Sequence, residues 1–411
     1  MKYYLTFAWR NLWRNKKRTL LSTTSVLFAV FFATAFRSTQ SGQHDYFIQM
    51  SVSTYTGYLQ VQGKGYWDER SFDFSIEQND ALISLLAHTP HVTLINPRLE
   101  SVALISHELE TRISPVIGID PDSENEMSGL RKRLVEGSYL TDSSRGVMIA
   151  EGLAERLHVG IGDSIILYGQ GYQGVTAAEL LPVEGILRFP IPKMNNAMVY
   201  LPLAKAQSLF NAYNRVTGMV LMIDDMEKMK SIQSDLSARL DTNLVVMNWE
   251  EMSPEIVQVI QSDVAGELII MFILYTVIGF GVFGTVMMMA IERTREFGLL
   301  IALGMKRARL LLITTIEAML VSIIGALAGS VVAFPLLFYL NHNPIHLTGD
   351  AAKAMLAYGY EPILPVSIEP GVFLSQTIAV FLITIIVSIY PLLFIRKIQP
   401  VSALQGRGGV K

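Results

Sequence analysis

The sequence predicts an α-helical membrane protein with four transmembrane helices, arranged as one, a long gap and then three, and a large extracytoplasmic mixed α/β domain of two subdomains. Composition is the first indication: the 411 residues are 51% hydrophobic and only 17% charged, whereas soluble domains carry about 25% charged residues. The second is a set of four long apolar runs. The third is an acidic segment, residues 37–267, that separates the first run from the other three.

Several kinds of chemistry are excluded or not expected. The chain has no cysteine, which excludes disulfides, thiolate metal sites and a cysteine nucleophile. A net charge of -3 and a pI of about 6.2 argue against nucleic-acid binding. Neither Gly-x-x-x-x-Gly-Lys-Ser/Thr nor His-Glu-x-x-His occurs in the sequence, and Pro344 breaks the helical spacing between His342 and His346 that zinc would need. We therefore expect no catalytic, cofactor or metal site in this chain.

Residues 1–18 are predicted to form a cytoplasmic amphipathic helix, because apolar side chains recur at helical spacing opposite basic ones. The predicted apolar face is Leu5, Ala8, Trp9 and Leu12. Residues 19–36 follow without an ionisable side chain, which is just enough to span a bilayer. A rival interpretation is a cleaved signal peptide, with a cleavage site at Ala33-Thr34-Ala35. We favour an uncleaved first span, because the later runs commit the chain to the membrane in either case.

Residues 37–267 carry 17 Lys and Arg against 30 Asp and Glu. A segment of this length is too long for a connecting loop, so it is predicted to be a folded extracytoplasmic domain. A βαβ unit is predicted at about 219–247, with a helix near 226–240 between two strands. Alternating patterns predict further strands at 56–62, 101–105, 112–119 and 164–168.

The other three runs are predicted to be transmembrane helices. Residues 268–291 and 370–395 contain no charged side chain and are long enough to cross a bilayer with some tilt. Residues 310–340 form the third of the four spans, and Glu317 is the one charged residue within it.

Lys and Arg near the ends of the spans predict the orientation. They are concentrated in 1–18, in the link 292–309 and in the tail 396–411, so these three segments are expected in the cytoplasm. Residues 37–267 and the loop 341–369 are then expected outside.

The cytoplasmic link 292–309 is predicted to contain a short amphipathic helix along the membrane, because apolar side chains share one face and charges cluster at both ends. The apolar face is Phe297, Leu300, Ile301 and Gly304. Two interpretations stay open: a plain interfacial turn between two spans, and a docking element whose apolar face fits a groove on a soluble partner.

Polar and small residues inside the spans suggest helix packing. Glu317 lies ~10 Å along the third span, where it is either an interfacial or helix-helix hydrogen-bonding acid or, on a second interpretation, part of a proton relay. Gly325 with Gly329, and Gly281 with Gly284, give the third and second spans thin faces. Such faces allow close packing within one chain or between two chains.

Several motifs together are characteristic of one family. They are the basic opening Ala8-Trp9-Arg10-Asn11-Leu12-x-Arg14-Asn15-Lys16, the link Glu292-Arg293-x-x-Glu296-x-Gly298-x-x-x-Ala302-x-Gly304, Glu317 with the glycines after it, and the ending Tyr390-Pro391 with Pro400-Val401-Ser402-Ala403-Leu404. With these motifs the chain resembles permease subunits of the MacB/FtsX-like (type VII) ABC transporter superfamily over essentially its whole length.

Within that superfamily the outer domain is most similar to the lipoprotein-releasing LolC/LolE permeases. The similar stretches are Val116-Ile117-Gly118-Ile119-Asp120-Pro121, Gly169 to Gly174, Val199-Tyr200-Leu201-Pro202-Leu203 and Pro365 to Pro370. Permeases of the LolC kind that recruit a periplasmic carrier have a Pro-rich hook. Segment 170–178 is short and lacks proline, so direct carrier docking does not follow from the resemblance.

The resemblance implies a non-catalytic subunit of the bacterial inner membrane with its large domain in the periplasm. Two such permeases would pair, as a homodimer or heterodimer, through faces that include Gly281, Gly284, Glu317, Gly325 and Gly329. Each would dock its link on a separate cytoplasmic ABC ATPase, which would hold ATP and Mg²⁺. The implied coupling residues are Glu292, Arg293, Glu296, Phe297, Gly298, Leu300, Ile301, Ala302 and Gly304.

The implied function is release of a lipoprotein or a similar amphiphile from the outer leaflet, with a periplasmic carrier protein as a possible further partner. Two alternatives remain: a MacB-like efflux permease, and an FtsX-like signalling permease that controls a periplasmic partner.

Overall fold

The structure, a computed structural model, describes residues 2–14, 16–189, 191–357 and 361–396. All but the first residue of the predicted tail 396–411 lies outside this part of the chain. The chain forms two compact units. The first is drawn from the described residues of 1–45, 260–345 and 364–411, and the second from those of 46–259 and 346–363.

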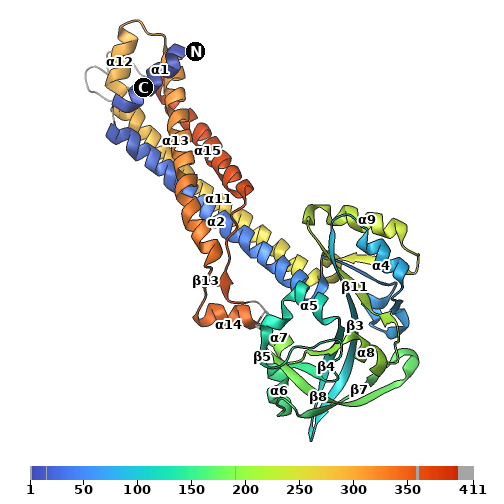
Figure 1. Ribbon diagram of the computed structural model, residues 1–411. Helices are drawn as coiled ribbons and strands as arrows, with labels where there is room; N and C mark the ends of the chain where they lie inside the picture. Colours follow the sequence, from blue (N-terminus) through green and yellow to red (C-terminus); the bar gives the residue numbers. More distant parts are fainter. Residues whose placement is uncertain (1, 15, 190, 358–360, 397–411) are drawn as a thin grey trace. The chain divides into compact units, whose positions relative to one another are not determined.

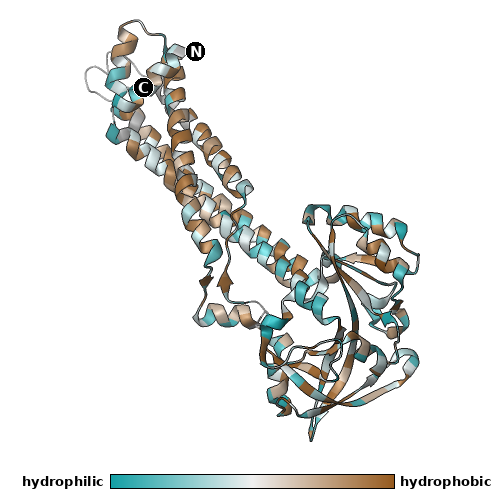
Figure 2. Cartoon of the chain, in the orientation of Figure 1, coloured by the Kyte–Doolittle hydropathy of each residue, from teal (hydrophilic) through white to brown (hydrophobic). Residues whose placement is uncertain are grey.

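Four long helices supply the first unit. They are α2 (Lys16–Ser51), α11 (Pro254–Glu292), α13 (Arg307–His342) and α15 (Pro370–Arg396). Among the described residues, each contains an apolar window long enough to cross a membrane, and Figure 2 shows hydrophobic residues along their middle parts. The predicted spans 19–36, 268–291, 310–340 and 370–395 fall within these helices, in this order.

Helices α2 and α11 are longer than the predicted spans inside them. The prediction ended each span at its first charged residue, Arg37 and Glu267. These two side chains form an ion pair with each other, and Glu267 is 5% exposed. Pairing between the helices therefore lets both continue past the apolar run.

The glycine face of α13 packs against α2. A Cβ atom on Gly325 would lie 2.7 Å from the Cβ of Val26, and one on Gly329 would lie 2.6 Å from the backbone oxygen of Leu27. Real Cβ atoms do not approach other atoms so closely, so only glycine allows this contact. Helix α13 also lies beside α15 (Figure 1), where the hydroxyls of Ser330 and Thr377 are 2.8 Å apart.

Two short helices complete this unit, α1 (Lys2–Arg14) and α12 (Thr294–Ala302). Helix α1 packs on α13 and buries Ala8, Asn11 and Leu12. The predicted apolar face is thus used only in part: Leu5 and Trp9 stay exposed, because the face that meets α13 follows the spacing i, i+3, i+4 from Ala8.

The second unit is built on one ten-stranded sheet, whose order is β12-β1-β11-β3-β4-β9-β6-β8-β5, with β7 pairing both β3 and β8. Its strands are β1 (Leu59–Gly63), β3 (Val92–His107), β4 (Glu110–Ile119), β5 (Leu134–Gly137), β6 (Val147–Ala150), β7 (Ser164–Gln170), β8 (Thr176–Leu187), β9 (Val199–Pro202), β11 (Gly218–Ile223) and β12 (Leu244–Asn248). The strands form one continuous sheet.

Helices and short elements accompany this sheet. The α-helices of the second unit are α3 (Tyr66–Glu69), α4 (Asp80–Ala87), α5 (Pro121–Ser128), α6 (Glu151–Leu157), α7 (Pro192–Asn195), α8 (Leu203–Leu209), α9 (Met229–Arg239), α10 (Trp249–Met252) and α14 (Gly349–Ala357). Single turns are η1 (Val52–Thr56), η2 (Phe72–Phe74), η3 (Leu130–Arg133), η4 (Tyr172–Gly174) and η5 (Met226–Lys228). The short strand pairs are β2 (Ile76–Glu77) with β10 (Arg215–Val216), and β13 (Ile345–His346) with β14 (Ile363–Leu364).

The βαβ prediction matches the order β11, α9, β12 along the chain. In the sheet, however, β1 lies between the two strands and is antiparallel to both. Strands β11 and β12 are therefore parallel to each other, and α9 is their crossover helix.

Strand β3 joins the two halves of the sheet. Its residues 92–98 pair with β11, and its residues 103–106 pair with β7. Both partners lie on the same edge, because β4 occupies the other edge from Arg98 to His107. Residues 99–102 therefore have no strand partner on the first edge, which opens a gap in the sheet between β11 and β7.

Candidate coupling site

Helix α12 forms where the chain turns between α11 and α13. Arg293 leaves the helical conformation (φ -94°, ψ 2°) and separates α12 from the end of α11. The nine-residue helix ends before Gly304, whose φ is +93°. This left-handed conformation is costly for other residues, so glycine ends the helix here.

The apolar face of α12 packs inside the chain. Phe297 is 1% exposed and contacts Leu310 at the start of α13. Leu300 and Ile301 pack around the same cluster, and Gly298 is buried. The sequence interpretation that offered this face to a soluble partner is therefore corrected: the nearest span covers it first.

The opposite face of α12 is exposed. Leu299 and Leu303, four residues apart and hence on one side of the helix, are 51% and 75% exposed. We call this surface the outer face of α12. It consists of Arg295, Glu296, Leu299, Ala302 and Leu303, all exposed. The sequence pattern missed Leu299 and Leu303 because they do not belong to the main apolar stripe.

Glu317 lies in a buried polar contact between three segments. Its side chain is 2% exposed, and the side chain of Arg293 is 5% exposed. Arg293 Nη1 donates to one carboxylate oxygen, and Asn11 Nδ2 from α1 donates to the other. Both oxygens thus have a donor, as a buried carboxylate requires. Glu317 therefore has the helix-helix hydrogen-bonding role that was one of the two sequence interpretations.

The contact extends to the surface through Glu296. Its carboxylate accepts from Arg293 Nε at 3.1 Å and from Arg14 Nη2 at 3.2 Å. Asn11 and Arg14 lie three residues apart on α1, so the backbone of α1 closes the chain of contacts into a ring. We call Asn11, Arg14, Arg293, Glu296 and Glu317 the Glu317 cluster.

The Glu317 cluster places the predicted coupling residues differently from one another. Arg293 lies inside the chain and anchors α12, while Glu292, Glu296, Ala302 and Gly304 are exposed. The sequence reasoning did not identify Asn11 as a partner, although its position beside Ala8 and Leu12 on one helix face was a signal. These contacts join α1, α12 and α13 through their side chains.

The two predicted glycine pairs differ in their surroundings. Gly325 and Gly329 contact α2, as described above. A Cβ atom on Gly281 or Gly284 would meet nothing within 4 Å among the described residues, and both glycines are exposed on α11. This thin face of α11 is thus open within the single chain.

Comparison with known proteins gives two family matches. Residues 19–239, more than half of the chain, match the model of the MacB-like periplasmic core domain. Residues 268–400 match the model of the FtsX-like permease C-terminal region.

Individual relatives are more distant. The lipoprotein-releasing system transmembrane protein LolC of Xylella fastidiosa (strain Temecula1 / ATCC 700964) is 23% identical over 79% of this chain and 80% of its own length. A macrolide export ATP-binding/permease protein, MacB 1/2 of Paracoccus denitrificans, is 23% identical over 85% of this chain but only 54% of its own length. Among solved structures, the periplasmic region of MacB from Actinobacillus actinomycetemcomitans is 17% identical, with a TM-score of 0.36, and covers 50% of this chain and 94% of that region.

Proposed function

Because the chain belongs to the MacB/FtsX-like family of ABC transporter permeases, we propose that it couples a separate cytoplasmic ATPase to movement of its periplasmic domain and thereby releases lipoproteins from the inner membrane. The observation that carries the coupling is the outer face of α12. It presents two exposed leucines on a helix whose other face is fixed by the chain itself.

The outer face of α12 has the character of a docking surface. Burial of an exposed leucine side chain contributes about 1.5 to 3 kcal/mol, and Leu299 and Leu303 project together with charged residues around them. A short amphipathic helix of this kind fits a groove on a partner. The Glu317 cluster then transmits a displacement of α12 to α1 and α13, because separation of the buried Glu317 carboxylate from its partners would be energetically costly.

The proposed topology places both ends of the chain and α12 in the cytoplasm, with the second unit in the periplasm. The distribution of Lys and Arg supports it. Helix α2 is continuous in the chain with η1, and α10 joins β12 to α11. Movement of either long helix is therefore delivered to the chain at β1 and β12, which are neighbours in the sheet.

Lipoprotein release is supported by the match to a protein named for that system over 79% of this chain. Efflux is the second candidate, and the match of residues 19–239 to the MacB-like core domain favours it. The relative named ATP-binding/permease protein is covered over only 54% of its length. This chain contains no P-loop motif, so we propose that its ATPase is a separate polypeptide.

A second permease completes the proposed complex. The open face of α11 around Gly281 and Gly284 suits it, because small residues allow two helix backbones to approach closely within a membrane. The same argument applies to a second copy of this chain and to a related permease.

Purification of the tagged chain from its native membrane tests the proposal. We expect a P-loop ATPase and acylated proteins to be identified by mass spectrometry in the purified complex. Leu299→Glu with Leu303→Glu should remove the ATPase. The control Leu109→Glu, at a leucine that is 99% exposed in the turn after β3, should retain it.

Two results would count against this function. Retention of the ATPase by the double variant would refute docking through the outer face of α12. Recovery of an outer-membrane channel and adaptor in place of acylated proteins would favour efflux over lipoprotein release.

A further inference from the structure

A cavity of about 500 Å³ lies in the second unit. It is located at the gap in the sheet between β11 and β7, where residues 99–102 of β3 have no strand partner. Glu100 and Val102 line it from this part of β3, and Pro115 lines it from β4. Cavities of this size hold drug-sized molecules, and no part of the proposed function uses this one.

The walls of the cavity combine aromatic and apolar side chains with polar ones. Tyr55, Tyr66 and Phe72 contribute rings, and Ile117 and Met198 contribute aliphatic surface. Such a lining with a few polar groups is typical of sites for small molecules that have an apolar body.

The charged groups of the cavity are mostly acidic. Glu69, Asp73 and Glu100 line it together with one base, Arg70. Glu100 is 10% exposed on its side chain and accepts from Tyr55 Oη at 2.8 Å and from Arg70 Nη1 at 3.3 Å. Glu69 and Asp73 have no side-chain ion pair or hydrogen bond among the described residues.

Arg70 is already engaged. Its guanidinium lies 3.7 Å from the ring centroid of Trp67 and pairs with Glu100. The pKa of the Tyr66 phenol is raised, mainly by burial and next by the negative charge of Glu100. With Arg70 and Glu100 paired, the net negative charge of the lining comes from Glu69 and Asp73, so the cavity favours a cation over an anion.

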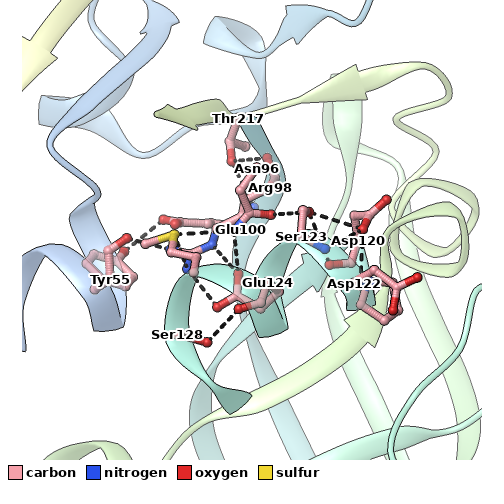
Figure 3. Close-up of polar contacts among 12 residues, drawn as sticks. Tyr55, Asn96, Arg98, Glu100, Asp120, Asp122, Ser123, Glu124, Ser128 and Thr217 are labelled. Carbon is pink, nitrogen blue, oxygen red and sulfur yellow. Dashed lines mark hydrogen bonds and ion pairs between the residues drawn. The ribbon is translucent and has the colours of Figure 1, made fainter. Parts of the chain in front are cut away.

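A second base, Arg98, lies behind the cavity but is neutralised. Figure 3 shows its guanidinium against the carboxylate of Glu124. Nε and Nη2 donate to the two carboxylate oxygens at 2.8 Å each, and Nη1 donates to the backbone oxygen of Tyr55 at 2.5 Å. Both side chains of the pair are 1% exposed. Arg98 thus contributes no unpaired positive charge to the cavity.

An exposed apolar strip leads away from the cavity mouth. Val102, which lines the cavity, is 60% exposed. On the same face of β3, Leu104 is 39% exposed and pairs in register with Ile113 of β4 and Tyr168 of β7, which are 72% and 51% exposed. Side chains two residues apart on a strand share a face, so the strip is continuous with the cavity.

We propose that this cavity binds a cationic amphiphile, with a protonated amine beside Glu100 and an apolar body between the aromatic walls and the strip. The amine loses its hydration water when it enters the cavity. A charge-assisted hydrogen bond to Glu100 and attraction to the tyrosine rings compensate for this loss. Glu69 and Asp73 at the rim add long-range attraction. Binding of this kind needs no ATPase, so the site goes beyond the proposed function and is tested separately from it.

Calorimetric titration of the full chain in phosphatidylcholine nanodiscs tests the site, with empty nanodiscs as the blank. The probes are 4-phenylbutylamine, the matched anion 4-phenylbutyrate and the neutral 4-phenylbutanol. We expect the amine to bind at least tenfold more tightly than the other two. An increase in salt from about 50 to 500 mM should weaken only the amine, because screening acts on its charge.

Variants locate the binding. Glu100→Gln keeps an acceptor for Tyr55 and Arg70 but removes the charge, so amine affinity should fall about tenfold. Glu126→Gln, at an exposed acid of α5 outside the cavity, should leave it unchanged. Val102→Trp fills the exposed mouth and should abolish binding, which keeps the test decisive if Glu100→Gln does not fold.

Three results would overturn the proposal: equal affinity for the anion, full affinity in Glu100→Gln, or full affinity in Val102→Trp. Absence of saturable amine binding above the blank would overturn it as well. None of these results bears on ATPase docking.

Discussion

Arg293 shows how one side chain determines the position of a helix. It stands at the break between α11 and α12, and its guanidinium reaches Glu317 with Nη1 and Glu296 with Nε. A buried ion pair gives little net stability compared with an apolar pair, but removal of one partner leaves the other charge buried and unpaired. Arg295, two residues further along, is exposed on the outer face of α12.

Arg293→Leu is therefore expected to destabilise the protein, because it leaves the Glu317 carboxylate buried without a counter-ion. The cost should be about 3 kcal/mol, which corresponds to a fall in Tm of roughly 6 to 12 °C for a unit of this size. Thermal unfolding in detergent measures it. Arg295→Leu is the matched control and should change Tm by no more than ~2 °C. Equal effects of the two substitutions would contradict the buried position of Arg293.

Of the residues in this buried contact, only Glu317 could be identified from the sequence. Glu317 was conspicuous because a charge interrupts an apolar run. Its partners were not, since Asn11 lies more than 300 residues away and Arg293 looked like one of several surface charges. Arg98 and Glu124 were not identified either, because an ion pair between a strand, β3, and a helix, α5, leaves no periodic signal.

The sequence identified the helices and strands that have a continuous apolar run or a regular alternation of apolar and polar residues. The apolar runs lie within α2, α11, α13 and α15, and the predicted strand 112–119 lies within β4. The sheet order was not predictable, because β1 inserts between β11 and β12 from a distant part of the chain. The surface that covers the apolar face of α12 was not predictable either, since the amphipathic pattern gives an apolar face but not its partner.

The two glycine pairs predict opposite effects of one substitution. Gly329→Val places a branched side chain where even a Cβ atom is 2.6 Å from the backbone of α2, so α2 and α13 must separate and Tm should fall by several degrees. Gly284→Val meets nothing within 4 Å in the single chain. It should leave the Tm of the monomer unchanged and weaken association of two permeases, measured by crosslinking or by mass photometry in detergent. A large loss of monomer stability in Gly284→Val would contradict this assignment.

At the scale of the whole molecule, the chain combines a helical unit with a sheet unit that carries a cavity and an apolar strip. Its sequence contains no P-loop motif. In the proposed account, ATP binding to a separate protein moves α12, and the long helices deliver the movement to β1 and β12. In the same proposed account, the work is done at the periplasmic side. Family membership rests on matches to both parts of the chain.

The most direct test measures whether the second unit moves when ATP is added. The chain has no cysteine, so Asp142→Cys, at an exposed residue of this unit, gives a single spin-label site. Two labelled permeases are reconstituted with their ATPase in nanodiscs. Pulsed electron-electron double resonance between the two labels should show a distance distribution that shifts when ATP is added. The shift should vanish in Leu299→Glu with Leu303→Glu. A distribution that ignores ATP, or a shift that survives the double substitution, would contradict the account.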